Sequence, residues 1–317
     1  MSRERRALRA AAVLCGAALA AACASTAPRP PAAIAPASPI DAAVEAGSRL
    51  CSCRIGVAAR HLESGRAYDR RADERFEAAS VIKIAVLTEA MAAVRDGRVD
   101  LTERWTLTGE NKAAESGWLK NFDSGLAPTW NDLATLMIGP SDNTATNAWI
   151  ERLGVEAVNA RMESLGFGGV RLLSVLPWLD PAVPGPRWTG FRFGEATPGE
   201  VALWLARVAT GELFDEDSSR RIFRYLDHAP SRARLARRFS SAALWAGKTG
   251  TMSGVRNDAG ILRTGKGRFV LVVFTDGSPG GSETSLIHPA VAAMSDVARA
   301  IVDEWSRDLP DLPGQPR

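Results

Sequence analysis

A serine is followed three residues later by a lysine, Ser80 and Lys83, at the start of an apolar run. If a helix begins at or just before Ser80, residues three apart lie on one face, so the hydroxyl and the amine point the same way. The positive end of the helix dipole would favour a developing anion there. The pair could be a nucleophile beside its base, although a serine at a helix start and a solvated lysine also explain this spacing.

Two further motifs follow this pair along the chain. Ser141-Asp142-Asn143 lies between two predicted helices, and Lys248-Thr249-Gly250 ends a predicted strand. Together with Ser80 and Lys83 they make the S-x-x-K, S-D-N and K-T-G set of class A β-lactamases and penicillin-binding proteins. Each motif is weak alone, but three in this order and in fitting structural contexts indicate a serine acyl-transfer site.

The chain resembles the class A serine β-lactamase family, within the serine β-lactamase/penicillin-binding-protein superfamily, over roughly residues 40 to 308. The text around the motifs is also similar to the family's, at 71–76, 133–147 and 256–258. The separations, 61 residues from Ser80 to Ser141 and 107 from Ser141 to Lys248, are similar to those of the family. The resemblance implies a hydrolase without a cofactor or a metal ion.

The resemblance also implies catalytic roles. Ser80 would attack a strained amide carbonyl, and Lys83 or a relaying water would take its proton. The charge of Lys248 would keep Lys83 partly neutral, and Ser141 would pass a proton to the leaving nitrogen. The backbone N–H groups of Ser80 and Thr251 would form the oxyanion hole.

Substrate binding follows from the same resemblance. The implied substrate-binding residues are Asn143, Thr249, Gly250, Thr251, Trp118 and Arg256. Asn143 would bond the acyl amide of the substrate, while Lys248, Thr249 and Arg256 would hold its carboxylate. Trp118 would be an aromatic gate, or alternatively an ordinary core residue.

The chain departs from the family where the acyl group is released. Class A enzymes carry a glutamate in E-P-x-L-N, whereas this chain has Leu176-Pro177-Trp178-Leu179-Asp180. Leucine cannot deprotonate water, and losing a general base costs about 10²–10⁴ in the step that the base serves. Either Asp180 takes the role of base or deacylation is slow. An ordinary turn aspartate before proline is the alternative interpretation of Asp180.

The expected activity is therefore opening of a β-lactam amide through an acyl-enzyme at Ser80. The expected partner is a small-molecule β-lactam or a cell-wall peptide. One alternative is a D-Ala-D-Ala peptidase or esterase of the same superfamily. Another is a slow-turnover penicillin-binding lipoprotein that acts as a sensor.

The first 23 residues predict export to the periplasm or cell envelope. A basic stretch at 3–9 precedes an apolar stretch at 10–22 that is too short to span a bilayer comfortably. Ala20-Ala21-Ala22-Cys23 is similar to a lipoprotein cleavage site, with Cys23 as the lipidated residue, and a lipid there would be the only membrane contact. Ala22-Cys23-Ala24 also fits ordinary signal cleavage. Residues 24–39, rich in alanine and proline, predict an extended linker.

The rest of the chain predicts one domain over 40–308 and a disordered tail over 309–317. Strands are expected at 54–59, 66–68, 243–248, 257–262 and 268–274. Helices are expected at 40–50, 80–96, 131–137, 142–153, 155–165, 197–208 and 286–305. This order predicts an α/β (α+β) fold of the β-lactamase/transpeptidase-like type. Strands from both ends would form an antiparallel sheet covered by helices, beside a mostly helical subdomain at about 100–205.

The charge, cysteine and histidine content argues against nucleic-acid binding and against a metal site. A net charge of +3 with scattered basic residues predicts no nucleic-acid binding, and the cluster at 232–238 predicts a solvated helix face. Cys51 and Cys53 would close a strained disulfide ring, so two small buried residues are expected instead. Because the three histidines are scattered, no metal site is predicted. A monomer is expected.

Overall fold

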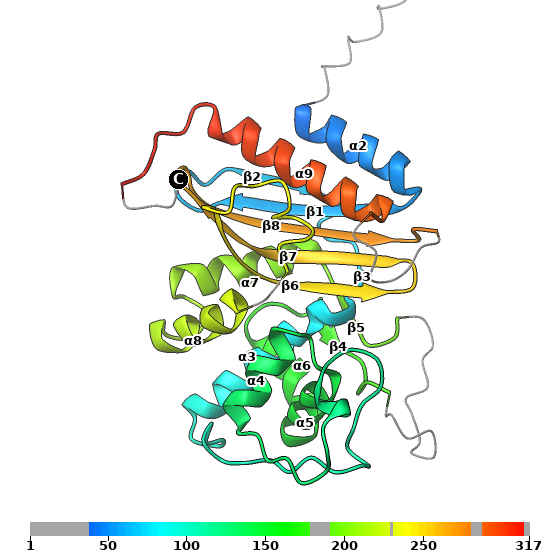
Figure 1. Ribbon diagram of the computed structural model, residues 1–317. Coiled ribbons are helices and arrows are strands. Elements are labelled where there is room, and N and C mark those ends of the chain that lie inside the picture. The colour runs from blue at the N-terminus through cyan, green and yellow to red at the C-terminus, as the bar shows by residue number, and fades with distance from the viewer. Residues whose placement is uncertain (1–37, 178–190, 229–230, 280–286, 314–317) are drawn as a thin grey trace, which may run out of the picture. The chain divides into compact units, whose positions relative to one another are not determined.

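Five strands form an antiparallel sheet in the order β2-β1-β8-β7-β6 (Figure 1). The computed structural model describes residues 38–177, 191–228, 231–279 and 287–313. The strands are β1 (Arg54–His61), β2 (Ala67–Arg70), β6 (Leu244–Met252), β7 (Val255–Thr264) and β8 (Gly267–Asp276). Since β1 pairs with β8, Val57 opposite Val273, the predicted sheet from both ends of the domain is confirmed.

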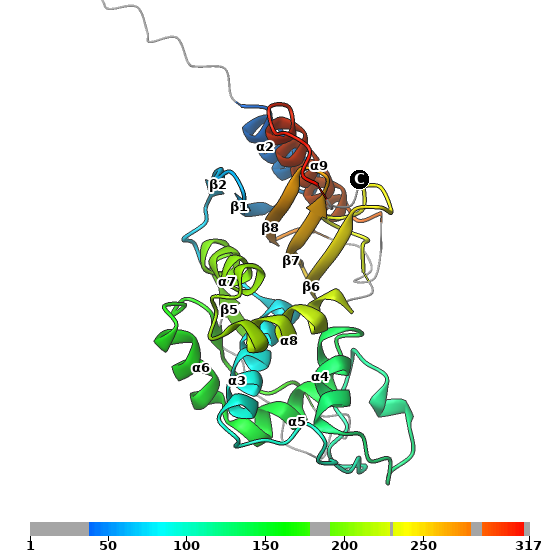
Figure 2. The ribbon, with the colours of Figure 1, turned by 90° about the vertical axis from the view of Figure 1, so that its left-hand side faces the viewer.

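Helices cover both faces of this sheet. Helices α2 (Pro39–Cys51) and α9 (Pro289–Ser306) pack together on one face, and α7 (Pro198–Thr210) packs on the other (Figure 2). Strand residues alternate between two apolar cores, as a period of two requires. Val57 and Val273 lie in the core under α2 and α9, whereas the neighbouring Ala58 and Val272 lie in the core of the helical side.

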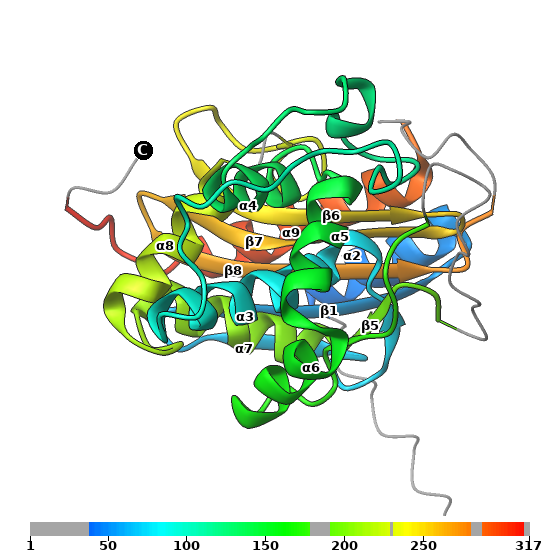
Figure 3. The ribbon, with the colours of Figure 1, turned by 90° about the horizontal axis from the view of Figure 1, so that it is seen from below.

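The helical part surrounds one central helix, α3 (Lys83–Arg95), which packs against its neighbours from several sides (Figure 3). Those neighbours are α4 (Trp130–Ile138), α5 (Asn143–Leu153), α6 (Val155–Ser164) and α8 (Glu216–Asp227). Helix α8 was not predicted, and neither was a small sheet of β3 (Phe76–Glu77), β5 (Gly194–Ala196) and β4 (Arg171–Leu172). None of the helices in the described part of the chain is long and apolar enough to cross a membrane.

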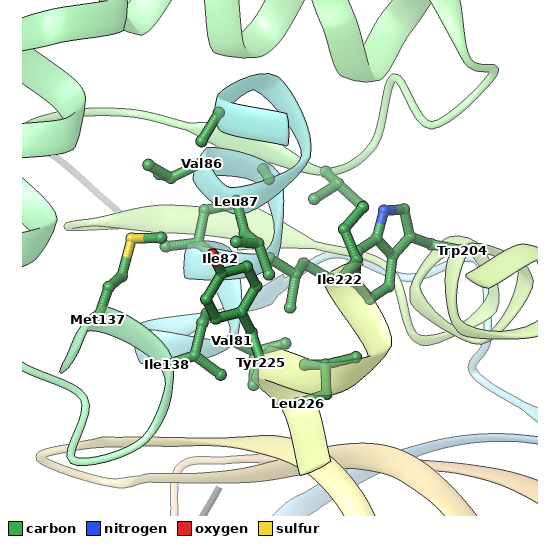
Figure 4. Close-up of a cluster of buried hydrophobic side chains, with 14 of the residues drawn as sticks. Val81, Ile82, Val86, Leu87, Met137, Ile138, Trp204, Ile222, Tyr225 and Leu226 are labelled. Carbon is green, nitrogen blue, oxygen red and sulfur yellow. The ribbon is translucent and has the colours of Figure 1, made fainter. Parts of the chain in front are cut away.

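The apolar side chains at the start of α3 anchor it (Figure 4). Val81, Ile82, Val86 and Leu87 are buried in one cluster. The side chains packed around them come from α4, α7 and α8: Met137, Ile138, Trp204, Ile222, Tyr225 and Leu226.

The first residues of the predicted helix are in fact a 3₁₀ turn, η1 (Ala79–Ile82), and α3 begins at Lys83. Lys83 lies one residue beyond this turn, and the common direction of Ser80 and Lys83 stays a prediction.

The expectation for Cys51 and Cys53 was wrong in one respect. Both are buried, as expected, but they form a disulfide. The expectation assumed a strand, whereas Cys51 ends α2 and Ser52 has a left-handed backbone with φ of 48°. This bend brings the two Cα atoms to 5.1 Å, within the range that a disulfide spans.

Several predictions concern residues outside the described part. These are the export segment with Cys23, the linker up to residue 37, the base candidate Asp180 and the end of the predicted tail.

Candidate active site

The turn that carries Ser80 lies directly against strand β6. A Cβ atom added to Gly250 would come within 2.6 Å of the Ala78 carbonyl oxygen and 3.2 Å of the Ser80 backbone nitrogen. Any larger residue at Gly250 would push the strand and the turn apart. The glycine of the K-T-G motif therefore allows β6 to reach the predicted nucleophile.

Lys83 points from the start of α3 to the S-D-N turn. Its Nζ donates to the Ser141 carbonyl oxygen at 2.7 Å, to Asn143 Oδ1 at 2.9 Å and to Ser141 Oγ at 3.2 Å. The side chain is fully buried. Burial, and then the like charge of Lys248, lower the pKa of Lys83 well below its ordinary value. A lysine in this state can accept a proton.

Lys248 reaches the same hydroxyl from strand β6. Its Nζ lies 3.0 Å from Ser141 Oγ and 3.0 Å from the Thr249 carbonyl oxygen. Burial, and then the charge of Arg234, lower the pKa of Lys248 to about 7. Ser141 has a φ of 59°, a left-handed conformation that is disfavoured for residues with a Cβ. The Ser141 hydroxyl thus bridges two buried lysines, as the motif set predicts.

The carboxylate of Asp142, the middle residue of S-D-N, organises the loop before it. Asp142 caps α5 by accepting from Ala145 N at 2.9 Å. It also accepts from Trp118 N at 2.6 Å and Leu119 N at 2.8 Å. From the sequence, Asp142 was recognised only as the middle residue of the S-D-N motif. An aspartate directly before a helix is nevertheless a favoured N-cap residue.

The substrate-binding candidate Asn143 is held by this same loop. Its Nδ2 donates to the Ala114 carbonyl oxygen at 2.9 Å, while its Oδ1 accepts from Lys83. Ala114 N in turn donates to the Pro177 carbonyl oxygen at 2.8 Å. The loop around Ala114 therefore joins the S-D-N turn to the segment that carries Leu176.

Trp118 is 60 % exposed on this loop. The alternative of ordinary core packing is therefore wrong. Its role as an aromatic gate stays a prediction.

Arg234 is a site residue that sequence reasoning missed. Its Nη1 donates to the carbonyl oxygens of Gly250 at 2.7 Å and Asn257 at 2.5 Å, and its Nη2 donates to Thr251 Oγ1. Burial lowers its pKa to about 10. The predicted solvated face at 232–238 is thus wrong at Arg234. The only sequence signal was the apolar pair Leu235 and Ala236 directly after it.

Arg256, the predicted carboxylate ligand, lies inside the β6–β7 hairpin. It is buried, and its Nη1 donates to the carbonyl oxygens of Met252 and Val255 at 2.8 Å each. Arg234, by contrast, bonds the Thr251 side chain. Both arginines therefore bond the K-T-G strand, Arg234 at Gly250 and Thr251 and Arg256 at Met252.

Leu176 occupies the predicted position of the missing glutamate and is 7 % exposed. Its side chain belongs to the apolar core of the helical side. Asp180, the other candidate in this segment, is outside the described residues. Within the described ranges, no group of three or more His, Cys, Asp or Glu side chains could hold a metal ion.

The chain matches known proteins over this whole domain. The model of the beta-lactamase enzyme family matches residues 38–305. A β-lactamase of Streptomyces fradiae is 32 % identical over 275 residues, which are 83 % of this chain and 87 % of that protein. The solved β-lactamase of Sphaerobacter thermophilus DSM 20745 superposes with a TM-score of 0.76 at 30 % identity, covering 86 % of this chain and 98 % of that one.

A solved penicillin-binding relative is also similar. PBP-A superposes with a TM-score of 0.70 at 25 % identity, covering 84 % of this chain and 96 % of that chain. A leucine-to-glutamate mutant of PBP-A has been solved as an acyl-enzyme complex with penicillin G, with a TM-score of 0.71, 25 % identity, and coverage of 85 % and 96 %. Taken with the family match over residues 38–305, these similarities mean that the chain belongs to the beta-lactamase enzyme family, of the class A serine type.

Proposed function

We propose that Ser80 opens the amide of a β-lactam and forms an acyl-enzyme that is released slowly. The observation that carries this proposal is the Ser141 hydroxyl held between Lys83 and Lys248, at 3.2 and 3.0 Å. Two buried amines with lowered pKa values on one hydroxyl make a path for protons. A surface lysine with an ordinary pKa would stay charged and could not act as a base.

In the proposed acylation, the Ser80 Oγ bonds to the carbonyl carbon and the C–N bond of the lactam breaks. The hydroxyl proton of Ser80 moves to the neutral Nζ of Lys83. The leaving nitrogen receives a proton from the Ser141 hydroxyl, which the adjoining lysines resupply. The N–H groups of Ser80 and Thr251 stabilise the oxyanion, and one such donor is typically worth about 10²–10³ in rate.

The positive charge that would bind the substrate carboxylate comes from Lys248 on the K-T-G strand and from Arg234 beside it. Lys248 and Thr249 stand on β6, and the Arg234 guanidinium lies on Gly250 and Thr251 of the same strand. A β-lactam carboxylate bound there would gain charge-assisted hydrogen bonds in a buried site.

Release of the acyl group is the slow half of the proposed cycle. The Leu176 side chain is buried and apolar, so it can neither orient nor deprotonate a water. Asp180 is the candidate for an alternative base.

Intact-protein mass after mixing with a fluorescent penicillin tests the acylation. The expected adduct has the mass of the protein plus the penicillin, and it is absent in Ser80→Ala. An adduct that survives in Ser80→Ala would overturn the proposal, as would no adduct in the unchanged protein. Stopped-flow decay of the adduct in Asp180→Asn tests the base, since an unchanged decay would remove Asp180 from that role.

Leu176 also favours a second candidate, a D-Ala-D-Ala peptidase or esterase of the superfamily. Such an enzyme would turn over a peptide or an ester faster than it releases a β-lactam. A panel of nitrocefin, D-alanyl-D-alanine peptides and small thioesters, followed by absorbance and by intact mass, separates the two. Rapid nitrocefin turnover would argue against the peptidase.

We also propose that the protein is exported and lipid-anchored through Cys23. The basic stretch, the short apolar stretch and Ala20-Ala21-Ala22-Cys23 support this. Metabolic labelling with palmitate and fractionation of the expressing cell test it. Label that persists in Cys23→Ser would contradict acylation at this residue, and protein retained in the cytoplasm would contradict export.

A further inference from the structure

The turn before Ser80 has an unusual backbone. Ala79 has a φ of 46°, a left-handed conformation that its Cβ disfavours. The peptide between Ala79 and Ser80 supplies the N–H that is proposed for the oxyanion hole. The direction of that N–H therefore depends on whatever keeps Ala79 in this conformation.

One buried carboxylate holds that turn. Glu77 Oε1 accepts from the Ala79 N–H at 3.1 Å. Its Oε2 accepts from Arg192 N at 2.5 Å, and its Oε1 also lies 3.5 Å from Gly194 N. Arg192 and Gly194 follow the segment 178–190 in the chain. The Glu77 side chain thus joins the nucleophile turn to residues that follow segment 178–190 in the chain.

The surroundings suit a carboxylate acting as an acceptor only. All three contacts of the Glu77 side chain are backbone N–H donors. Among the residues that the structure describes, no cation lies within ion-pair distance of Glu77. Its own carbonyl oxygen accepts from Asn257 Nδ2 at 2.7 Å, so the backbone is fixed as well. A glutamine here would turn an NH₂ group toward at least one N–H donor.

We propose that Glu77 is a positioning residue for acylation: its carboxylate keeps Ala79 left-handed and thereby aims the Ser80 N–H at the oxyanion. This inference rests on the proposed acylation at Ser80. Because one oxyanion donor is worth about 10²–10³ in rate, a partly misdirected one should cost at least about tenfold. The loss should fall on the acylation rate constant and leave the affinity for the β-lactam largely unchanged.

Glu195 offers a matched control. It is the register partner of Glu77 in the β3–β5 pair, and both residues are 7 % exposed. Its carboxylate accepts from Arg75 at 2.7 Å. A glutamine at Glu195 removes a buried charge from the same small sheet without touching the turn before Ser80.

The experiment measures stopped-flow acylation of the full chain by a fluorescent penicillin, with the rate constant and the half-saturation concentration fitted separately. We expect Glu77→Gln to lower the rate constant at least tenfold, and Glu195→Gln to change it less than threefold. Glycine has no Cβ penalty at positive φ, so Ala79→Gly added to Glu77→Gln should recover a measurable part of the loss.

Three outcomes would overturn the proposal. They are a rate constant in Glu77→Gln within threefold of the unchanged protein, an equal loss in Glu195→Gln, and no recovery with Ala79→Gly. If Glu77→Gln does not fold, Glu77→Asp takes its place in the same comparison, because it keeps the charge and shortens the reach. Failure of the unchanged protein to form an adduct would instead reject acylation itself, so the two failures are distinct.

Discussion

The side chain of Asn147 holds the backbone of Leu176 through two hydrogen bonds. Asn147 Oδ1 accepts from Leu176 N at 2.8 Å, and its Nδ2 donates to the Leu176 carbonyl oxygen at 2.9 Å. Asn147 is fully buried on α5, one turn after Asn143. The backbone at Leu176 is therefore fixed independently of the side chain that it carries, so that side chain can be exchanged without releasing the segment.

The first prediction concerns the missing base. Leu176→Glu should shorten the lifetime of the penicillin adduct at least tenfold, since a positioned general base is worth about 10²–10⁴. The measurement is the decay of the adduct by intact mass and by stopped-flow fluorescence. Leu176→Gln is the control, because it has the same size and polarity without a proton acceptor of that strength. Equal lifetimes in the two variants would show that position 176 does not serve deacylation.

The second prediction concerns the pH dependence of acylation. Lys248 has a pKa of about 7, and its charged form, which would bind the substrate carboxylate, prevails below that pH. The kcat/KM for acylation should therefore fall as the pH rises through about 7. Arg234 contributes to lowering this pKa, so Arg234→Gln should move the fall to higher pH by about half a unit or more, besides weakening binding.

Arg237→Gln is the control for this experiment, since Arg237 is an exposed residue of the same segment. It should leave the pH profile in place. A profile in Arg234→Gln that coincides with that of the unchanged protein would contradict the assigned coupling between Arg234 and Lys248.

The fold was largely predictable because its signals are local. Apolar runs and alternation mark β1, β7 and β8, and helix caps and glycines mark the ends of α4 to α7. Helix α8 was missed because its first two turns are polar, and only Ile222, Tyr225 and Leu226 show the helical period. Those three residues pack with α3 in one apolar core, and this contact forms only in the folded chain.

Within the site, the residues of the three motifs were predictable from the sequence. Ser141, Lys83 and Lys248 meet as expected, yet the residues that position them come from elsewhere in the chain. Arg234 donates to Gly250, which lies 16 residues further along the sequence, and Glu77 accepts from Arg192, which lies 115 residues further along. No local pattern reports such contacts. The left-handed Ala79 is likewise invisible, because alanine is not a residue type that favours positive φ.

The third prediction concerns the free energy of unfolding, which the buried amine of Lys248 lowers. The folded pKa of Lys248 is lowered to about 7, whereas an unfolded lysine keeps about 10.4. Between these values the unfolded chain binds more protons, so the stability of the unchanged protein should rise with pH across that window. Lys248→Met should accordingly be more stable below pH 7, and its advantage should shrink toward pH 10.

Urea unfolding at several pH values between 6 and 10 measures this difference. Lys112→Met, at a lysine whose Nζ donates to the Phe122 carbonyl oxygen on the surface, is the matched control. A stability difference between Lys248→Met and the unchanged protein that stays constant over the whole range would refute the buried-charge explanation.

The last prediction concerns Asp142, whose carboxylate accepts from Ala145, Trp118 and Leu119. In Asp142→Asn one oxygen can still cap α5, but the amide nitrogen would face the two N–H donors of the loop. Hydrogen bonds to a charged group are worth about 1.5–3 kcal/mol each, so the free energy of unfolding should fall by about 3 kcal/mol or more. The half-saturation concentration for a β-lactam should also rise, because the loop holds Asn143 through Ala114.

Asp215→Asn is the matched control for Asp142→Asn. Asp215 caps α8 by accepting from Ser218 N at 2.8 Å, and asparagine is an equally good cap, so its unfolding free energy should change by less than about 1 kcal/mol. Chemical denaturation and acylation kinetics on the two variants give both readouts. Equal losses of stability in the two variants would mean that Asp142 acts only as a helix cap. A normal half-saturation concentration in Asp142→Asn would mean that the loop does not support substrate binding.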